Sequence, residues 1–264
     1  MSVVIVIPAR FASTRLPEKM LLAKTNWPLI RHTYEQAKKA TLAERVLIAT
    51  DHERIFETIK SFGGEVVMTS KDHPTGSDRL AEVAEKYLSN EDIIINVQGD
   101  EPEIAPKNID HLIELFQASH AEMATLVTPF KSNPLEPNSV KAVLGPAVKH
   151  KQTSHILGYQ ALYFSRSIIP YPRASKGEVI NFSDYYHHLG IFAYKADFLK
   201  KYVTLPQGRL ELAESLEQLR LLEYGYKIVA GIVEHATPGI DSQEDYNQFV
   251  NRFYAQRETN EICA

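Results

Sequence analysis

Cysteine is almost absent from this chain of 264 residues, and because Cys263 is the single one, no disulfide can form within the chain. Such low cysteine content is typical of proteins in a reducing compartment. No apolar run approaches the roughly 20 residues that a membrane span requires. The apolar start at residues 3–7 is interrupted early by Arg10 and Arg15, unlike a secretory signal. We therefore expect a cytoplasmic protein without a membrane span.

A basic excess is missing as well. The chain has 29 Lys and Arg against 33 Asp and Glu, a net charge of −4. Proteins that bind nucleic acid broadly usually carry a basic excess, so we expect no nucleic-acid partner. Salt screens charges beyond about 8 Å, so any anionic ligand must be held by local groups. With 44% hydrophobic and 23% charged residues, the composition is that of a globular protein.

Short apolar runs alternate with helical patterns through the first half of the chain. The runs are nearly continuous in hydrophobicity, as in strands that are covered on both faces of a parallel sheet. Strands are predicted at 3–7, 46–50, 66–69 and 93–97, and helices at 29–39, 54–62, 78–87 and 109–116. This alternation indicates an α/β fold with a doubly wound, mostly parallel sheet.

The pattern changes after about residue 122, where strands follow one another across proline-rich connectors. Strands are predicted at 123–130, 140–144, 160–164, 189–194 and 227–233, helices at 213–224 and 245–256, and a polar loop at 145–158. We therefore divide the chain into an α/β region, 1–122, and a second region, 123–264. The last part of the second region, about 227–250, is expected to rejoin the first sheet.

Polar clusters follow three of the predicted strands, at the end of the sheet where α/β proteins bind ligands. The first cluster, residues 8–19, places Arg10, Arg15 and Lys19 on one loop. Charge-assisted bonds from such cations, together with aligned backbone amides, suit a phosphate chain. The loop matches neither the GxxxxGK[S/T] nor the GxGxxG pattern. The alternative is a basic loop that contacts only solvent.

The other two clusters have ligand-binding and purely structural interpretations. Gln98-Gly99-Asp100-Glu101-Pro102 follows the strand at 93–97, and a carboxylate there suits Mg²⁺ held between protein and phosphates. The alternative is a turn or a helix cap. In the segment 72–79, Thr75 and Ser77 precede Asp78 and fit a helix cap, while Arg79 and the backbone amides fit contacts to a base.

Together the clusters resemble the bacterial sugar-acid cytidylyltransferases, and most closely the CMP-Kdo synthetases (3-deoxy-manno-octulosonate cytidylyltransferases). The motifs are Ile-Pro-Ala-Arg-x-x-Ser-Thr-Arg-Leu-Pro-x-Lys from residue 7, His-x-x-Gly-x-Asp-Arg from residue 73 and Val-Gln-Gly-Asp-Glu-Pro from residue 97. The resemblance runs from about residue 2 to 250. It implies a Rossmann-like nucleotidyltransferase fold with a nucleotide-binding first region and a smaller β-rich region for sugar binding and dimerisation.

Members of that family couple CTP to Kdo, an eight-carbon 2-keto sugar acid, and release CMP-Kdo for lipopolysaccharide assembly and pyrophosphate. The resemblance implies Mg²⁺ as cofactor, CTP and a sugar acid as substrates, and a homodimer. It implies these site residues: Pro8, Ala9, Thr75, Gly76, Ser77, Arg79 and Gln98 for the nucleoside; Arg10, Arg15 and Lys19 for the triphosphate; Asp100 and Asp241 for the metal; Arg166, Tyr185, His188, Glu217 and Gln218 for the sugar. Arg10, Arg15, Lys19 and Asp100 would be the catalytic group.

Four features depart from the family pattern. Glu18 replaces a glycine beside the phosphate loop, and His187 replaces a basic residue near the expected sugar site. The connector at 145–158 is longer than usual, and the tail beyond about 250 has no assigned counterpart. A modified sugar, such as 8-amino-8-deoxy-Kdo, or another acidic sugar such as sialic acid is therefore an alternative substrate. A nucleotide-binding regulator without catalysis is a third possibility, which the pair Asp100 and Asp241 disfavours.

Overall fold

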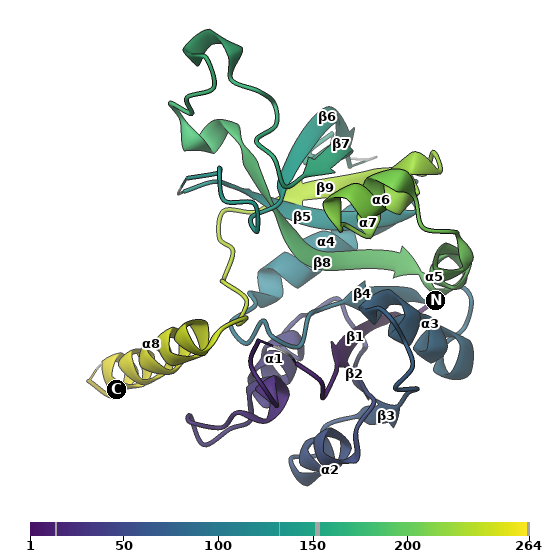
Figure 1. The fold of residues 1–264 in the computed structure, drawn as a ribbon. Coiled ribbons are helices and arrows are strands. Elements are labelled where there is room, and N and C mark those ends of the chain that lie inside the picture. The colour runs from purple at the N-terminus through teal and green to yellow at the C-terminus, as the bar shows by residue number, and fades with distance from the viewer. Residues whose placement is uncertain (14, 132, 151–153, 263–264) are drawn as a thin grey trace.

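The computed structural model describes residues 1–13, 15–131, 133–150 and 154–262, with side chains to residue 257, so Cys263 lies outside the described residues. Within them, one nine-stranded sheet has the order β3-β2-β1-β4-β8-β5-β9-β7-β6 (Figure 1). The strands are β1 (Val3–Ala9), β2 (Arg45–Thr50), β3 (Val66–Met68), β4 (Ile93–Asn96), β5 (Met123–Pro129), β6 (Lys141–Lys149), β7 (Ile156–Ser165), β8 (Tyr186–Lys195) and β9 (Ile228–Ile232).

Helices connect these strands and cover the sheet. They are α1 (Leu29–Ala37), α2 (Glu53–Ser61), α3 (Gly76–Tyr87), α4 (Pro106–Ala118), α5 (Ala196–Thr204), α6 (Arg209–Glu214), α7 (Gln218–Glu223) and α8 (Gln243–Ile262), with short 3-10 turns η1 (Lys19–Leu21), η2 (Arg173–Ser175) and η3 (Phe182–Asp184). No helix of the described residues combines the length and apolar character needed to cross a membrane.

The four strands β1–β4 pair in parallel, as the continuous apolar runs predict. β1 shows why these runs do not alternate in polarity. Ile5 and Ile7 pack into the core on one face of the sheet, whereas Val4 and Val6 pack into the core on the other face. Both faces of the strand are therefore buried, and the predicted doubly wound α/β class is confirmed for this half of the molecule.

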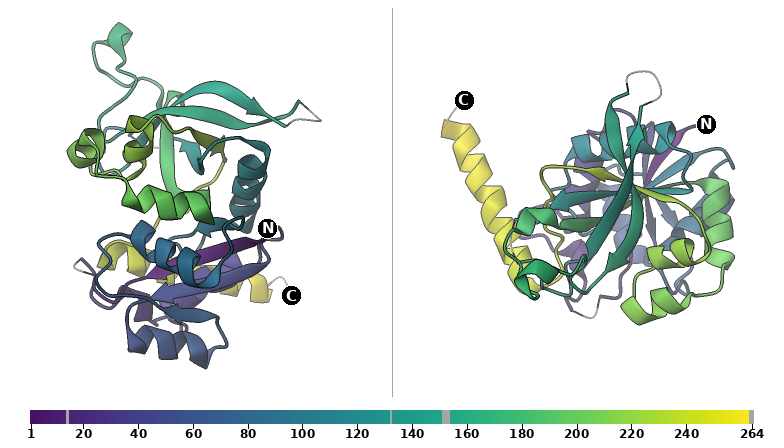
Figure 2. Two further views of the ribbon diagram at one scale, coloured as in Figure 1. Left: turned by 90° about the vertical axis from the view of Figure 1, so that its right-hand side faces the viewer. Right: turned by 90° about the horizontal axis from the view of Figure 1, so that it is seen from above.

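β8 joins the two halves of the sheet, because it pairs antiparallel with β4 on one side and with β5 on the other. The predicted division near residue 122 falls between α4 and β5, and the sheet continues across it. β9 lies between β5 and β7, so the late strand re-enters the sheet within the second half. It is α8 that returns to the first half, where Tyr246 and Phe249 pack with Leu16 and Leu29. Further along α8, Arg252 binds Glu103 and Phe253 packs against His32, and the C-terminal end of the helix extends away from the body (Figure 2).

Two local predictions are wrong. The segment 145–158 is not simply a loop: most of it belongs to the antiparallel hairpin of β6 and β7, whose pairing shifts register at three places. The single helix predicted at 213–224 is two helices, α6 and α7, because Ser215 adopts a left-handed φ of 52° at the end of α6. The sequence analysis also did not predict α5.

Candidate active site

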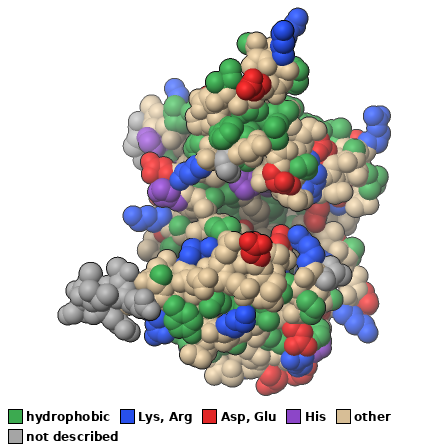
Figure 3. Space-filling model, turned by 60° about the vertical axis from the view of Figure 1, so that its left-hand side comes forward, with side chains coloured by type: hydrophobic (Ala, Val, Ile, Leu, Met, Phe, Trp, Pro, Cys, Tyr) green, Lys and Arg blue, Asp and Glu red, His purple; other side chains and the backbone are tan. Residues whose placement is uncertain are grey.

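Three cavities lie where the ends of β1 and β4 meet the start of β8. The loop cavity, about 230 Å³, is lined by Pro8, Arg10, Lys19, Gly76, Gln98, Asp100 and their neighbours. The central cavity, about 310 Å³, is lined by Ser77, Gln98, His188, Glu217, Gln218 and neighbours. The outer cavity, about 340 Å³, is lined by Glu101, Asn108, residues 187–191 and 236–239, and neighbours. Figure 3 shows the molecule hollowed across its middle, with acidic and basic side chains on the rim.

The loop after β1 lies tightly against the loop after β4. A Cβ atom at Gly99 would lie 3.0 Å from both the Pro8 carbonyl oxygen and the Met20 sulfur, so a larger residue would push the two loops apart. The missing side chain thus lets Asp100 approach the cations of the first loop. Arg10 donates to the Pro74 carbonyl at 3.1 Å, which connects this loop to the third polar cluster.

Lys19 contacts residues from distant parts of the chain. Its Nζ lies 2.5 Å from Asp100 Oδ2 and 3.4 Å from Asp241 Oδ1, and it donates to the Ile240 carbonyl at 2.7 Å. Arg15 contacts the same Asp241 oxygen at 2.9 Å, and its side chain is 71% exposed. The structure therefore brings the predicted cations and carboxylates to one place, although Asp241 follows Asp100 by more than half the chain.

The arrangement of these carboxylates fits a magnesium ion. Both carboxylates converge on a single cationic nitrogen, and carboxylate oxygens are the ligands that Mg²⁺ prefers. Within the described part of the chain, no group of three or more His, Cys, Asp or Glu residues forms a metal cage. Mg²⁺ usually binds through one or two carboxylates together with substrate phosphates and water, so a pair is sufficient.

Glu18 is directed away from this cluster. Its carboxylate accepts two hydrogen bonds from Arg54, at 2.5 and 2.9 Å, in the first turn of α2. The hydrogen bond from Arg54 is the main reason that the pKa of Glu18 is lowered. The negative charge that departs from the family pattern is thus compensated by α2.

The central cavity contains the expected sugar-binding residues of α7 and its N-terminal end. Ser77 donates to Glu217 Oε2 at 2.8 Å, and Tyr202 donates to the Glu217 carbonyl at 2.8 Å. Burial raises the pKa of Glu217, although the bond from Ser77 opposes this. Gln218 Nε2 is buried without a hydrogen-bond partner among the described residues, and it lines the cavity. An unsatisfied donor at a cavity wall is suited to a ligand oxygen.

The two histidines of β8 are not cations at neutral pH. Burial, and secondarily the neighbouring His187, lowers the pKa of His188 to about 3, and its ring makes a 2.9 Å hydrogen bond with Thr125 Oγ1. Burial also lowers the pKa of His187. Both rings therefore offer hydrogen-bonding and packing surfaces instead of positive charge.

Seven predicted site residues do not line the three cavities. Two of them, Arg15 and Asp241, lie beside the loop cavity in the cluster around Lys19, and the other five lie elsewhere. Arg79 is fully buried, and its guanidinium binds Asp51 at 2.8 Å and Ser70 and Thr69, so the interpretation of Arg79 as a base contact is wrong. Tyr185 is buried and lines none of the three cavities. Ala9 is buried in β1, and Thr75 forms a capping box with Asp78 at the start of α3.

Arg166 is the fifth. Its guanidinium donates to the backbone carbonyls of Glu214, Pro137 and Ser215. Ser215 itself lines the central cavity, so Arg166 lies directly behind the cavity wall.

The sequence analysis assigned no role to several residues that line the cavities. Glu101 belongs to the quoted motif after β4, and Gly190 lies two residues after the predicted sugar-binding residue His188. Asn96, Tyr194 and Tyr202 line the central cavity from β4, β8 and α5. Burial, and secondarily the charge of Asp100, raises the pKa of Glu101 to about 8. No periodicity marks such residues, because they meet only after the two halves of the sheet assemble.

A parallel sheet with a cationic loop and paired carboxylates at its carboxyl edge defines a nucleotidyltransferase type of site. The chain belongs to the cytidylyltransferase family, whose model matches residues 4–228.

Several proteins with sequences similar to this chain share one enzyme name. The chain is 46% identical over 247 residues to the 3-deoxy-manno-octulosonate cytidylyltransferase of Parabacteroides distasonis, covering 91% of this chain and 93% of that one. It is 45% identical over 263 residues to the enzyme of the same name from Chlorobaculum tepidum, covering 97% and 99%. Among solved structures, CMP:2-keto-3-deoxy-manno-octonic acid synthetase complexed with CTP superposes with a TM-score of 0.84 at 38% identity, covering 97% of this chain and 100% of that one.

Proposed function

We propose that this cytidylyltransferase couples CTP to a 3-deoxy-octulosonate sugar acid, giving a CMP-sugar and pyrophosphate. The anomeric hydroxyl of the sugar forms a bond to the α-phosphorus of CTP while the bond to the departing pyrophosphate breaks, and the hydroxyl proton is released. The observation that carries this proposal is the convergence of Lys19, Asp100 and Asp241 beside the loop cavity. In the family this product supplies lipopolysaccharide assembly, and we extend that role, a cytoplasmic location and a homodimer to this chain.

Phosphoryl transfer needs positioning and charge neutralisation more than covalent chemistry from the protein. Arg10, Arg15 and Lys19 supply positive charge at the end of β1, where the triphosphate would lie. Lys19 is held in place before the substrate binds, because both carboxylates and the Ile240 carbonyl fix its ammonium group. Such preorganisation lowers the cost of reorganising charges during the reaction.

Asp100 and Asp241 would hold Mg²⁺, since they are the two carboxylates that share one cation. When bound, Mg²⁺ neutralises phosphate charge and lowers the pKa of a nearby hydroxyl. We assign no general base: His188 is neutral, buried and bonded to Thr125.

The central cavity would hold the sugar. Glu217 and Gln218 offer an acceptor and an unsatisfied donor to its hydroxyl groups. We propose Arg166, which lies behind Ser215, as the partner for the sugar carboxylate. The guanidinium of Arg166 donates to backbone carbonyls, so no ion pair among the described residues compensates its charge.

A pyrophosphate-release assay with CTP, Mg²⁺ and Kdo tests the proposal. Turnover is expected with CTP and a 3-deoxy-octulosonate. Activity with CTP but only with 8-amino-8-deoxy-Kdo or sialic acid would indicate the alternative substrates. Absence of turnover with every pair, together with CTP binding, would indicate a nucleotide-binding regulator.

The variant Asp100→Ala tests the site. It is expected to abolish turnover while the thermal unfolding temperature stays close to that of the wild type, because Asp100 binds the phosphate-loop cation at the surface of the cavity. Asp197→Ala is the matched control, since Asp197 is exposed in the first turn of α5. Wild-type rates for Asp100→Ala would refute its role.

A further inference from the structure

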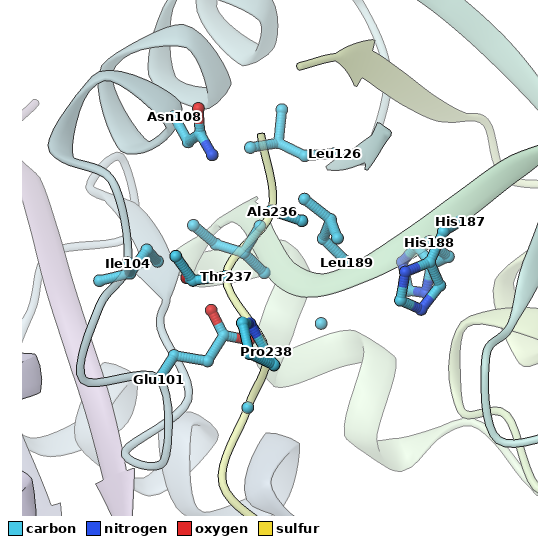
Figure 4. A pocket seen from close by; sticks show the side chains of 13 residues that line it. Glu101, Ile104, Asn108, Leu126, His187, His188, Leu189, Ala236, Thr237 and Pro238 are labelled. Carbon is cyan, nitrogen blue, oxygen red and sulfur yellow. The ribbon is translucent and has the colours of Figure 1, made fainter. Parts of the chain in front are cut away.

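The outer cavity has no part in the function proposed above. With about 340 Å³ it is as large as the central cavity, and His188 and Gly190 line both (Figure 4). A Cβ atom at Gly190 would lie 3.7 Å from Gln98 Cγ and 3.9 Å from Glu101 Oε1. The two cavities therefore adjoin at this glycine, and a side chain larger than a methyl group there would crowd Gln98 of the central cavity and Glu101 of the outer one.

The wall of the outer cavity combines hydrogen-bonding groups with an apolar surface. Glu101, Asn108 and Thr237 provide polar atoms, whereas Leu126 and Leu189 provide apolar surface. In Figure 4, Glu101 projects from the connection between β4 and α4 toward the connector after β9, which carries Thr237 and Pro238. An apolar surface with a few polar groups is typical of sites that bind small molecules.

The charge of the wall restricts what can bind. The described residues that line this cavity include no lysine or arginine, and Glu101 is the single acidic one. Its carboxyl group has no hydrogen-bond or ion-pair partner among the described residues, whereas Glu103 two residues later binds Arg252 at 2.6 Å. A carboxyl group at a cavity wall without a partner is costly unless a ligand supplies hydrogen-bond donors. The described lining also has no lysine or arginine that could bind an anionic ligand group.

We infer that the outer cavity receives the distal end of the sugar acid, and that Glu101 is a specificity-determining residue that accepts hydrogen bonds from donors on that end. The inference rests on the proposed function and deepens it. The carboxylate of the sugar then lies at the opposite end, in the central cavity near Arg166, because the outer cavity offers no cation among its described residues. Hydroxyl and ammonium groups share the required donor chemistry.

Steady-state kinetics of Glu101→Gln test the inference. The change keeps the size of the side chain but replaces one carboxyl oxygen by an amide group, so the KM for Kdo is expected to rise about tenfold, which corresponds to the loss of one hydrogen bond. The KM for CTP and the Mg²⁺ concentration for half-maximal rate are expected to stay within about twofold of the wild type. Glu103→Gln is the control, because Glu103 lies on the same connection but outside the outer cavity, and it should leave the KM for Kdo unchanged.

Substrates of different length and terminal group give a second readout. A shortened 3-deoxy-2-keto sugar acid that lacks the terminal carbons should bind wild type and Glu101→Gln equally, measured as an inhibition constant against Kdo turnover. Kdo and an 8-amino analogue both present a hydrogen-bond donor at the terminal carbon, so Glu101→Gln should lose affinity for each, and the larger loss identifies the natural donor.

Gly190→Val provides an independent variant. A branched side chain would fill the passage beside Gln98 and Glu101, so the KM for Kdo should rise at least tenfold while the shortened acid is less affected. An unchanged KM for Kdo in both variants, with an active wild type, would overturn the inference and leave the proposed function standing. A wild type that releases no pyrophosphate with any sugar acid would overturn both.

Discussion

The backbone of Glu18 has a φ of 51°, a left-handed conformation that glycine adopts at little cost and that disfavours residues with a Cβ atom. Its carboxylate is held by Arg54 of α2 and faces away from Lys19 and Asp100. The structure therefore gives no support to the idea that Glu18 repels the triphosphate, and the cost of the residue is one of backbone conformation.

This leads to a prediction about the order of two variants. Both Glu18→Gly and Glu18→Ala remove the carboxylate, but only Gly relieves the left-handed strain, so Glu18→Gly should unfold at the higher temperature. The KM for CTP of Glu18→Gly should stay within about threefold of the wild type, since the exposed ion pair contributes little. Differential scanning fluorimetry and steady-state kinetics provide the measurements.

Glu35 provides the matched control. It lies in α1, where helix propensity favours alanine over glycine by about 1 kcal/mol. Glu35→Gly should therefore unfold at a lower temperature than Glu35→Ala. If the Gly and Ala variants had the same order of unfolding temperatures at both positions, the interpretation that Glu18 is strained in a left-handed conformation would be contradicted. A many-fold fall in the KM for CTP of Glu18→Gly would instead show that the Glu18 carboxylate repels the triphosphate.

At the scale of elements, the loop before α3 is anchored to that helix by one carboxylate. Glu82 accepts from the Ser70 amide at 2.8 Å, from Lys86 Nζ at 2.6 Å and pairs with His73 Nε2 at 2.5 Å. Burial alone would raise the pKa of Glu82, but these bonds outweigh burial and lower it to about 2. The anchored loop carries Pro74, whose carbonyl binds Arg10.

Glu82→Gln should therefore lower the free energy of unfolding at pH 7 by about 1–3 kcal/mol. Because the folded pKa lies below the unfolded one, the wild type has this stabilisation above about pH 4.5 and loses it as the pH falls toward 2. The difference between the two proteins in urea unfolding should thus be largest at neutral pH and shrink at pH 3. The exposed Glu85 of the same helix is the control, and Glu85→Gln should change stability by less than about 1 kcal/mol. A difference that is constant with pH would contradict this account.

The elements also show how far the sequence alone can predict the fold. The strands β1, β2 and β4 are buried on both faces, and their apolar runs made them predictable. The outer part of the β6–β7 hairpin is largely exposed and irregular in register, so its strands depend on pairing with each other and show no alternation. Ser215, which separates α6 from α7, is neither glycine nor proline, and nothing in the sequence marks the break.

The same reasoning applies to the site residues. Lys19, Asp100 and Asp241 could be placed together from motifs because they follow strands of one sheet or match the family. Arg79 lies in an equally suggestive motif, yet its guanidinium is buried against Asp51. Motif position does not reveal the direction of a side chain. The outer cavity forms only where the connection between β4 and α4 meets β5, β8 and the connector after β9.

At the scale of the whole molecule, the site depends on one crossing of the chain. The connector after β9 leaves the second half of the sheet, and the Ile240 amide donates to the Asp100 carbonyl at 2.9 Å. α8 then packs on the first half through Tyr246 and Phe249, and the Tyr246 hydroxyl accepts from the Lys24 amide at 2.7 Å (Figure 1). The position of Asp241 beside Lys19 is thus fixed by the contact between α8 and the first half.

Phe249→Ala tests this dependence. The side chain is 2% exposed, so its removal should destabilise the packing of α8 by about 3–5 kcal/mol and increase hydrogen exchange in residues 243–254. Because Asp241 would then be held less firmly, the KM for CTP and the Mg²⁺ requirement should rise several-fold, while the KM for the sugar acid should change little. Phe249→Leu should show the same changes more weakly, and Gln248→Ala, on the exposed side of α8, should show neither. Faster exchange in α8 with an unchanged KM for CTP would mean that Lys19 and Arg15 alone keep Asp241 in place.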